Sequence, residues 1–240
     1  MYKYLKYKNK YLHLKKIIGG NSFITETFDP DDPDDFYTER QLIFLNNILQ
    51  KPEFHHFAFV KIEPTRVISN KLNNECRMDK DSFEICFPKE TTDSFIKISL
   101  TKLIIWLYNN VWRHYWTHGD LTTNNIIFDD ITKEFVVIDW KDRLSPEINP
   151  RKHVLLFILD LYDLLDSFSK KFIDIINVPG IIKIGLHIKT YETEIVDSDN
   201  EKIINDIIYA NDKYINNFLY DIQILTGIDF HSFITELLSY

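Results

Sequence analysis

Two carboxylates and one carboxamide stand at spacings that could hold a magnesium ion and activate a hydroxyl group. They lie in two short motifs, His118–Asn125 (HGDLTTNN) and Val137–Trp140 (VIDW), and Asp139 comes fourteen residues after Asn125. Asp120 would accept the proton of an attacking hydroxyl, whereas Asn125 and Asp139 would supply the hard oxygen ligands that Mg²⁺ prefers beside substrate phosphates. This is the equipment of phosphoryl transfer, which depends on positioning and charge neutralisation more than on covalent chemistry.

Apolar periodicity predicts that the first motif is a polar loop between a helix and a β-hairpin and that the second strand of this hairpin ends on Asp139. Leu103–Trp116 repeats apolar side chains near the 3.6-residue period of a helix, and Gly119 breaks it. Ile126–Phe128 and Phe135–Ile138 are short apolar runs that predict the two strands of the hairpin. Asp139 then emerges from a buried strand, where a charge requires a partner or a metal ion.

The first motif, extended to Ile126, resembles the catalytic loop of the small atypical kinases of the KEOPS tRNA-modification complex. The segment Ile138–Trp140 is more similar to aminoglycoside and choline phosphotransferases, in which a Trp often follows the metal-binding Asp. Both groups share the protein-kinase fold. The resemblance implies an α+β, protein-kinase-like fold with a reduced N-terminal lobe and a mostly helical C-terminal lobe, and it implies ATP and Mg²⁺ as cofactors.

The resemblance also implies a role for each matching residue. Asp120 corresponds to the catalytic base, Asn125 to the second metal ligand and Asp139 to the principal metal ligand. His118 corresponds to a structural histidine that packs beside the residue after that Asp, here Trp140. Taken singly, the pieces are an ordinary helix-terminating turn and a strand-end cap, but their order and spacing favour a site.

The region after the two motifs is predicted to be mostly helical. Arg151–Ile176 is apolar nearly all round, which is typical of a buried helix. Its Asp160 resembles the Asp that steadies the catalytic loop from beneath in the KEOPS kinases. Ile181–Lys189 alternates like a strand, and Glu201–Tyr240 predicts two helices that divide near Gly227. The basic C-terminal tail typical of the KEOPS kinases is absent, which weakens a tRNA-modification role.

The region before the motifs departs from the family. Kinases of this fold use a glycine-rich phosphate cover, a strand lysine and a helix glutamate. Phe36–Leu49 is predicted to be the helix, and Glu39 matches its glutamate, although a Glu in a first turn also acts as a simple dipole partner. Asn21–Asp35, just before this helix, contains no basic residue, and Gly19 and Gly20 are the only glycines before Gly119.

Two lysines in strand-like segments could replace the missing strand lysine. Lys61 lies in Phe57–Ile62, and Lys97 lies in the second strand of a predicted hairpin, Phe83–Phe87 and Ser94–Leu100. Both follow the predicted helix, so either would approach the phosphates from an unusual direction. Otherwise each is the polar face of a half-buried strand.

The sequence therefore predicts a Mg²⁺-dependent phosphotransferase that moves the γ-phosphate of ATP to a hydroxyl acceptor. Thr122 and Thr123 favour a Ser/Thr protein acceptor, and Trp140 favours a small molecule. The alternative is a catalytically weak or dead pseudokinase that serves as an interaction module. The missing glycine loop and lysine support this alternative, and the intact Asp120, Asn125 and Asp139 oppose it.

The first twenty residues form a predicted basic amphipathic leader. An aromatic and aliphatic stripe recurs at helical spacing among lysines, and Gly19 and Gly20 end it. Such a helix could dock on a partner or an anionic surface, or pack on its own domain. It resembles a leader found on proteins of giant DNA viruses, which implies a viral origin.

The predicted domains are the leader (1–20), an acidic linker (21–35), a reduced N-lobe-like region (36–100) and a catalytic C-lobe (101–240).

Bulk properties exclude several classes of protein. The 240 residues can bury a substantial core, and the net charge of −8 argues against general nucleic-acid binding. Cys76 and Cys86, the only cysteines, form no disulfide framework, so a reducing compartment is expected: the cytoplasm, or the host cytoplasm or virion if the protein is viral. No apolar run reaches the ~18 residues of a membrane span, and no signal-peptide core is present.

Overall fold

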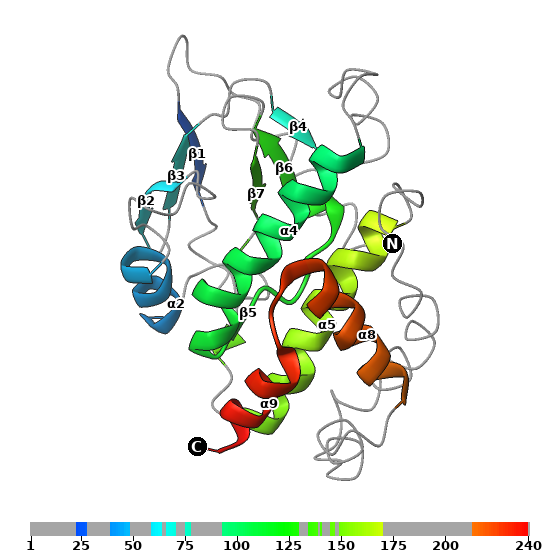
Figure 1. The fold of residues 1–240 in the computed structure, drawn as a ribbon. Coiled ribbons are helices and arrows are strands. Elements are labelled where there is room, and N and C mark those ends of the chain that lie inside the picture. The colour runs from blue at the N-terminus through cyan, green and yellow to red at the C-terminus, as the bar shows by residue number, and fades with distance from the viewer. Residues whose placement is uncertain are drawn as a thin grey trace, which may run out of the picture. The chain divides into compact units, whose positions relative to one another are not determined.

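The structure is a computed structural model of the chain, and it describes residues 23–27, 39–48, 59–63, 66–70, 75–77, 93–129, 134–138, 140, 145–146, 149–169 and 213–239. The chain divides into two compact units, Met1–Glu75 with Asp129–Thr132, and Cys76–Phe128 with Lys133–Tyr240. Helices and small sheets make up the described elements, so the fold class is α+β (Figure 1).

The described residues of the first unit form a three-stranded antiparallel sheet and a helix. The sheet has the order β1-β3-β2, formed by β1 (Phe23–Thr27), β2 (Phe59–Glu63) and β3 (Arg66–Asn70). The helix α2 (Glu39–Ile43) continues as one π-helical segment, η2 (Phe44–Ile48), which contacts β2. The helix predicted at Phe36–Leu49 is thereby confirmed over 39–48, and its outermost residues lie outside the described part.

The acidic linker predicted over 21–35 is wrong for residues 23–27. These residues form β1, and Thr25 pairs with Ile68 in the middle of the antiparallel register with β3. Phe23 is aromatic and Ile24, Thr25 and Thr27 are β-branched, and both kinds of residue favour a strand. The acidic, proline-containing residues 28–35 lie outside the described residues.

The second unit is built on α4 (Asp93–Asn110), an 18-residue helix. Five of its buried apolar residues follow the helical period, namely Ile96, Leu100, Leu103, Ile104 and Leu107. The strand predicted at Ser94–Leu100 is therefore wrong, because this segment continues the same apolar stripe into the predicted helix that follows. The domain boundary predicted between 100 and 101 falls inside α4, and the two compact units divide after Glu75. The predicted strand at 83–87 lies outside the described residues.

Helix α4 ends six residues earlier than the periodicity predicts. After Val111 the chain forms a 3-10 turn, η3 (Trp112–His114), and reverses at Tyr115, whose φ of 62° is left-handed. It then enters β5 (Trp116–Thr117), which pairs antiparallel with β8 (Ser145–Pro146). The first motif, which begins at His118, follows β5 directly.

The predicted β-hairpin after the first motif is confirmed. A 3-10 turn, η4 (Thr123–Asn125), leads into β6 (Ile126–Asp129), which neighbours β7 (Glu134–Val137) in a sheet of order β4-β6-β7. The third strand is β4 (Glu75–Arg77), and α4 packs against β7.

Three helices complete the second unit (Figure 1): α5 (Pro150–Ser169), α8 (Lys213–Thr226) and α9 (Phe230–Leu238). The break predicted near Gly227 is confirmed. Gly227 has a φ of 76°, and the Asp229 side chain caps α9 by accepting a hydrogen bond from the Ser232 N–H. The predicted residues 170–176 and the strand at 181–189 lie outside the described part.

Aromatic side chains join η3, α5 and α9 in the core. The rings of Phe157 and Phe233 lie 5.2 Å apart, and the Trp112 ring lies 6.1 Å from Phe157 and 6.4 Å from Phe230. These residues are buried. Within the described residues, none of the helices combines the length and apolarity that crossing a membrane requires.

Candidate functional site

The first motif forms a loop that joins β5 to β6. It brings the side chains of Asp120 and Asn125 together: the Asn125 Nδ2 donates to the Asp120 backbone carbonyl at 2.8 Å and to its Oδ2 at 3.2 Å. Asn125 is buried, with 8% of its surface exposed, whereas Asp120 is partly exposed. A carboxylate that solvent can reach is therefore oriented by a carboxamide that solvent hardly reaches.

His118 links the two motifs. It is fully buried, its Nε2 donates to the Ile138 carbonyl at 2.9 Å, and its Nδ1 accepts from the Asp120 N–H at 3.3 Å. Since one ring nitrogen donates and the other accepts, these partners define the neutral Nε2–H tautomer. The contact expected between His118 and Trp140 is present, with the rings edge to face and 4.8 Å apart. Trp140 is itself held by an indole N–H···O bond of 3.0 Å to Val137.

The backbone of Ile138 is held on both sides by the loop. Its N–H donates to the Asn125 carbonyl at 2.9 Å, and its own carbonyl accepts from His118. Asp139 lies outside the described residues. Its two neighbours in the chain, Ile138 and Trp140, both contact residues of the first motif. The two motifs thus lie side by side where the strands of the β6/β7 hairpin begin and end.

Asp160 on α5 holds the start of the loop. Its Oδ2 accepts from the His118 N–H at 2.7 Å and from the Trp112 indole at 3.1 Å, and its Oδ1 accepts from the Gly119 N–H at 2.7 Å. Gly119 has a φ of 78°, a conformation that favours glycine. The contact expected beneath the loop is present. Burial raises the pKa of Asp160 to about 6, against the lowering effect of these three donors.

Two residues at the site were missed by the sequence analysis. Trp112 was assigned to a continuous helix, and nothing in its spacing pointed to Asp160. Ser167 accepts from the Thr123 N–H at 3.2 Å. A signal for Ser167 existed, because it follows Asp160 by seven residues, about two helical turns, and therefore shares a helix face with it.

The upstream candidates Glu39 and Lys61 belong to the first unit. Glu39 is the first residue of α2, and Lys61 lies on β2, the strand that η2 contacts. The strand before the helix is β1, whose sequence FITET contains no lysine. Strand β2 occupies the opposite edge of the sheet from β1. Among the strands that the structure describes in this unit, only β2, which follows the helix, contains a lysine.

The assignment of Lys97 requires a correction. It lies on α4 and is exposed, and its carbonyl accepts a hydrogen bond of 2.8 Å from the Thr101 hydroxyl. Lys97 was selected because alternation predicted a strand, and the helical stripe of α4 overrides that alternation. Lys97 consequently does not occupy the position of a strand lysine.

The residues of the loop suit a hard cation. Among the described residues no group of three or more His, Cys, Asp and Glu could hold a metal ion. Asp139 is not among the described residues, and Asn125 contributes a carboxamide instead of a carboxylate. The carboxamide oxygen of Asn125 and the carboxylate of Asp139, the residue after Ile138 in the chain, are the ligand types that Mg²⁺ takes beside phosphates.

Comparison with protein-family models and with curated proteins finds no match to this chain.

Proposed function

We propose that the chain is a Mg²⁺-dependent phosphotransferase with a protein-kinase-like fold, which moves the γ-phosphate of ATP to a hydroxyl acceptor. The observation that carries the proposal is the double attachment of Ile138 to His118 and Asn125. This attachment joins the loop of Asp120 and Asn125 to the residue immediately before Asp139. Asn125 and Ile138 flank the paired strands β6 and β7, so the backbone bond between them extends that pairing, and the bond from His118 to the Ile138 carbonyl adds a side-chain contact between the two motifs.

Each loop residue then has a task. Asp120 accepts the proton of the acceptor hydroxyl, and the Asn125 carboxamide orients its carboxylate. Asn125 and Asp139 would hold Mg²⁺, which neutralises the charge of the phosphates when bound. His118 and Asp160 act on the backbone of the loop and fix its position. The contact between β2 and η2, the segment that continues α2 after Glu39, supports the proposal that Lys61 and Glu39 act near the phosphates.

The test is a γ-phosphate transfer assay with Mg²⁺ or Mn²⁺ over protein Ser/Thr and small-molecule acceptors. Asp120→Asn should lower transfer by on the order of 10²- to 10⁴-fold and leave nucleotide affinity near that of the wild type. Asp139→Ala should abolish the metal-dependent thermal shift with ATP. Asp221→Asn, on α8, is the matched control and should behave as wild type. Equal loss of binding and turnover in Asp120→Asn would make Asp120 a ligand and not a base.

The second candidate is a pseudokinase that binds nucleotide without turnover. The observation in its favour is that β1, the strand before α2, lacks a lysine, and no glycine-rich cover precedes it. Nucleotide binding without transfer to any acceptor, and without hydrolysis in either metal, would select this function.

The leader, residues 1–20, lies outside the described part. We propose that it attaches the protein, in the cytoplasm or in a virion, to a protein partner or an anionic surface. Deletion of residues 1–20 should preserve the melting temperature and nucleotide binding but remove binding to anionic vesicles or to a partner. If the stripe packs on the domain instead, deletion should cost several kcal/mol, since each large buried apolar side chain contributes roughly 1.5–3 kcal/mol.

A further inference from the structure

The 3-10 turn η4, which presents Asn125, is capped from outside its own segment. Its N-cap residue, Thr122, makes no side-chain cap hydrogen bond. The N–H of Thr123, a residue only 5% exposed, instead donates to the Ser167 hydroxyl at 3.2 Å. The first N–H groups of a helical turn have no partner inside the turn. Ser167 therefore takes the place of an N-cap residue, although it lies 44 residues further along the chain.

The hydroxyl of Ser167 is oriented for this role by its own helix. It donates to the Asp163 carbonyl at 2.6 Å and lies 3.1 Å from the Leu164 carbonyl. A serine hydroxyl has one hydrogen and two acceptor lone pairs. Because α5 takes the hydrogen, the oxygen presents a lone pair to the Thr123 N–H.

The position of Ser167 bears directly on Asn125. The Asn125 N–H closes the turn on the Thr122 carbonyl at 3.0 Å, and its carboxamide contacts Asp120. We propose that Ser167 is a positioning residue for the metal-binding turn: it caps η4 from α5 and thereby sets the place of Asn125 beside Asp120. The metal part of this inference rests on the proposed function, whereas the cap rests on the hydrogen bonds alone.

One face of α5 thus holds both ends of the loop. Asp160 binds the backbone at His118 and Gly119, and Ser167 binds it at Thr123. The two residues are seven positions apart, about two turns of helix. The intervening loop can shift relative to α5 only if one of these attachments opens.

The experiment compares Ser167→Ala, Ser167→Thr and the control Thr235→Ala. Thr235 on α9 makes the same i−4 hydroxyl bond, 3.0 Å to the His231 carbonyl, at an exposed position. Three quantities are measured: the amide exchange of Thr123, the NMR shifts of the Asn125 side-chain amide, and the Mn²⁺ and Mg²⁺ dependence of transfer from ATP.

Ser167→Ala should speed the exchange of the Thr123 amide, move the Asn125 side-chain signals and weaken metal affinity on the order of 10-fold, as loss of a residue supporting a metal ligand does. Ser167→Thr keeps the hydroxyl and should restore all three. Thr235→Ala should change none of them.

Unchanged Thr123 exchange in Ser167→Ala would overturn the cap. Faster exchange with Asn125 signals and metal affinity as in the wild type would overturn the positioning role and leave Ser167 as a structural contact. If the wild type binds no metal, the proposed function fails, and the Thr123 and Asn125 signals then decide the positioning of the turn by themselves.

Discussion

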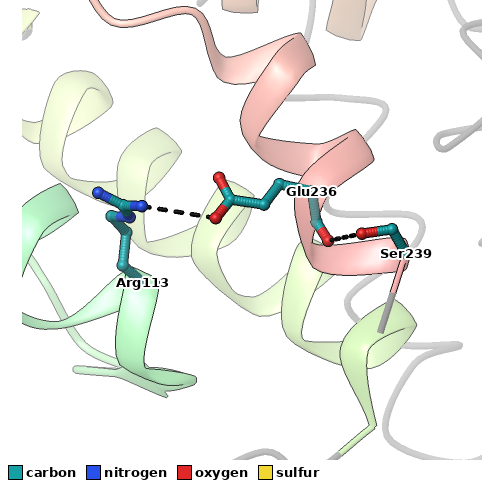
Figure 2. Close-up of polar contacts among 3 residues, drawn as sticks. All are labelled: Arg113, Glu236 and Ser239. Carbon is teal, nitrogen blue, oxygen red and sulfur yellow. Dashed lines mark hydrogen bonds and ion pairs between the residues drawn. The ribbon is translucent and has the colours of Figure 1, made fainter.

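Trp112 and Arg113 are adjacent in the chain, and each donates to an acidic residue on a different helix. Trp112 reaches the buried carboxylate of Asp160 on α5, at 3.1 Å. Arg113 reaches Glu236 on α9, at 3.4 Å, with side chains 44% and 49% exposed (Figure 2). Solvent screens the exposed pair, whereas no water competes at the buried carboxylate. The buried carboxylate of Asp160 should therefore contribute much more to the free energy of unfolding than the exposed carboxylate of Glu236. Of the two, only Asp160 contacts the loop.

The largest effect in this comparison should come from Asp160→Ala. It would leave three donors without an acceptor: the His118 N–H, the Gly119 N–H and the Trp112 indole. Each buried unsatisfied group costs about 1–3 kcal/mol, so the free energy of unfolding should fall by several kcal/mol in urea denaturation. Glu236→Ala is the control on the exposed side. Equal losses in both variants would contradict the role of burial.

The stability of the protein should depend on pH through Asp160. The pKa of Asp160 is raised from 3.8 to about 6 in the folded protein, with burial as the main cause. The folded state then binds more protons than the unfolded state between these values, so stability from this group is present below pH ~4 and lost as the pH rises through ~6. The amplitude is on the order of 3 kcal/mol.

The measurement is the unfolding free energy of the wild type minus that of Asp160→Asn, from about pH 4 to about pH 7. Asn does not titrate, so the difference isolates the carboxyl group, and it should fall across this range. A difference that rises with pH would mean that the three donors outweigh desolvation and hold the folded pKa below its unfolded value.

Trp112→Phe should have an intermediate effect. It removes one hydrogen bond to a charged group, worth about 1.5–3 kcal/mol, and retains most of the ring packing on Phe157. Because the indole N–H lowers the pKa of Asp160, its loss should also move the titration of that group to higher pH. A stability loss with no change in the pH profile would assign Trp112 to packing alone.

The smallest effect should come from Arg113→Ala. The exposed pair with Glu236 is worth roughly 0.2–1 kcal/mol and weakens further in salt. The Arg113 guanidinium also lies over the Tyr108 ring, 5.6 Å from its centroid. A double-mutant cycle with Glu236→Ala separates the two contributions. A coupling energy above ~2 kcal/mol would show that this surface contact matters as much as the buried one.

Different parts of the fold were predictable to different degrees. The helices on either side of Gly227 and the β6/β7 hairpin follow from local period and turn residues, which act within a few positions. The strand predicted at Ser94–Leu100 is wrong because a short stretch can match both periods, and only the buried stripe that it shares with Leu103 and Leu107 distinguishes the helix. The prediction for residues 23–27 failed because pairing with β3, 39 to 47 positions further along the chain, decides their conformation.

The sequence by itself determined which residue types stand in the two motifs, and the spacing that joins Asp120, Asn125 and Asp139 to a single kind of chemistry. Its resemblance to known kinases also predicted the contact of His118 with Trp140 and the contact of Asp160 with the loop. Tertiary structure alone decided that Ile138 is bonded on both sides, that Trp112 reaches Asp160 and that Ser167 caps the turn of Asn125. These contacts join residues 13 to 48 positions apart, so they depend on how α5 and the hairpin fold back onto the loop, which no local period records.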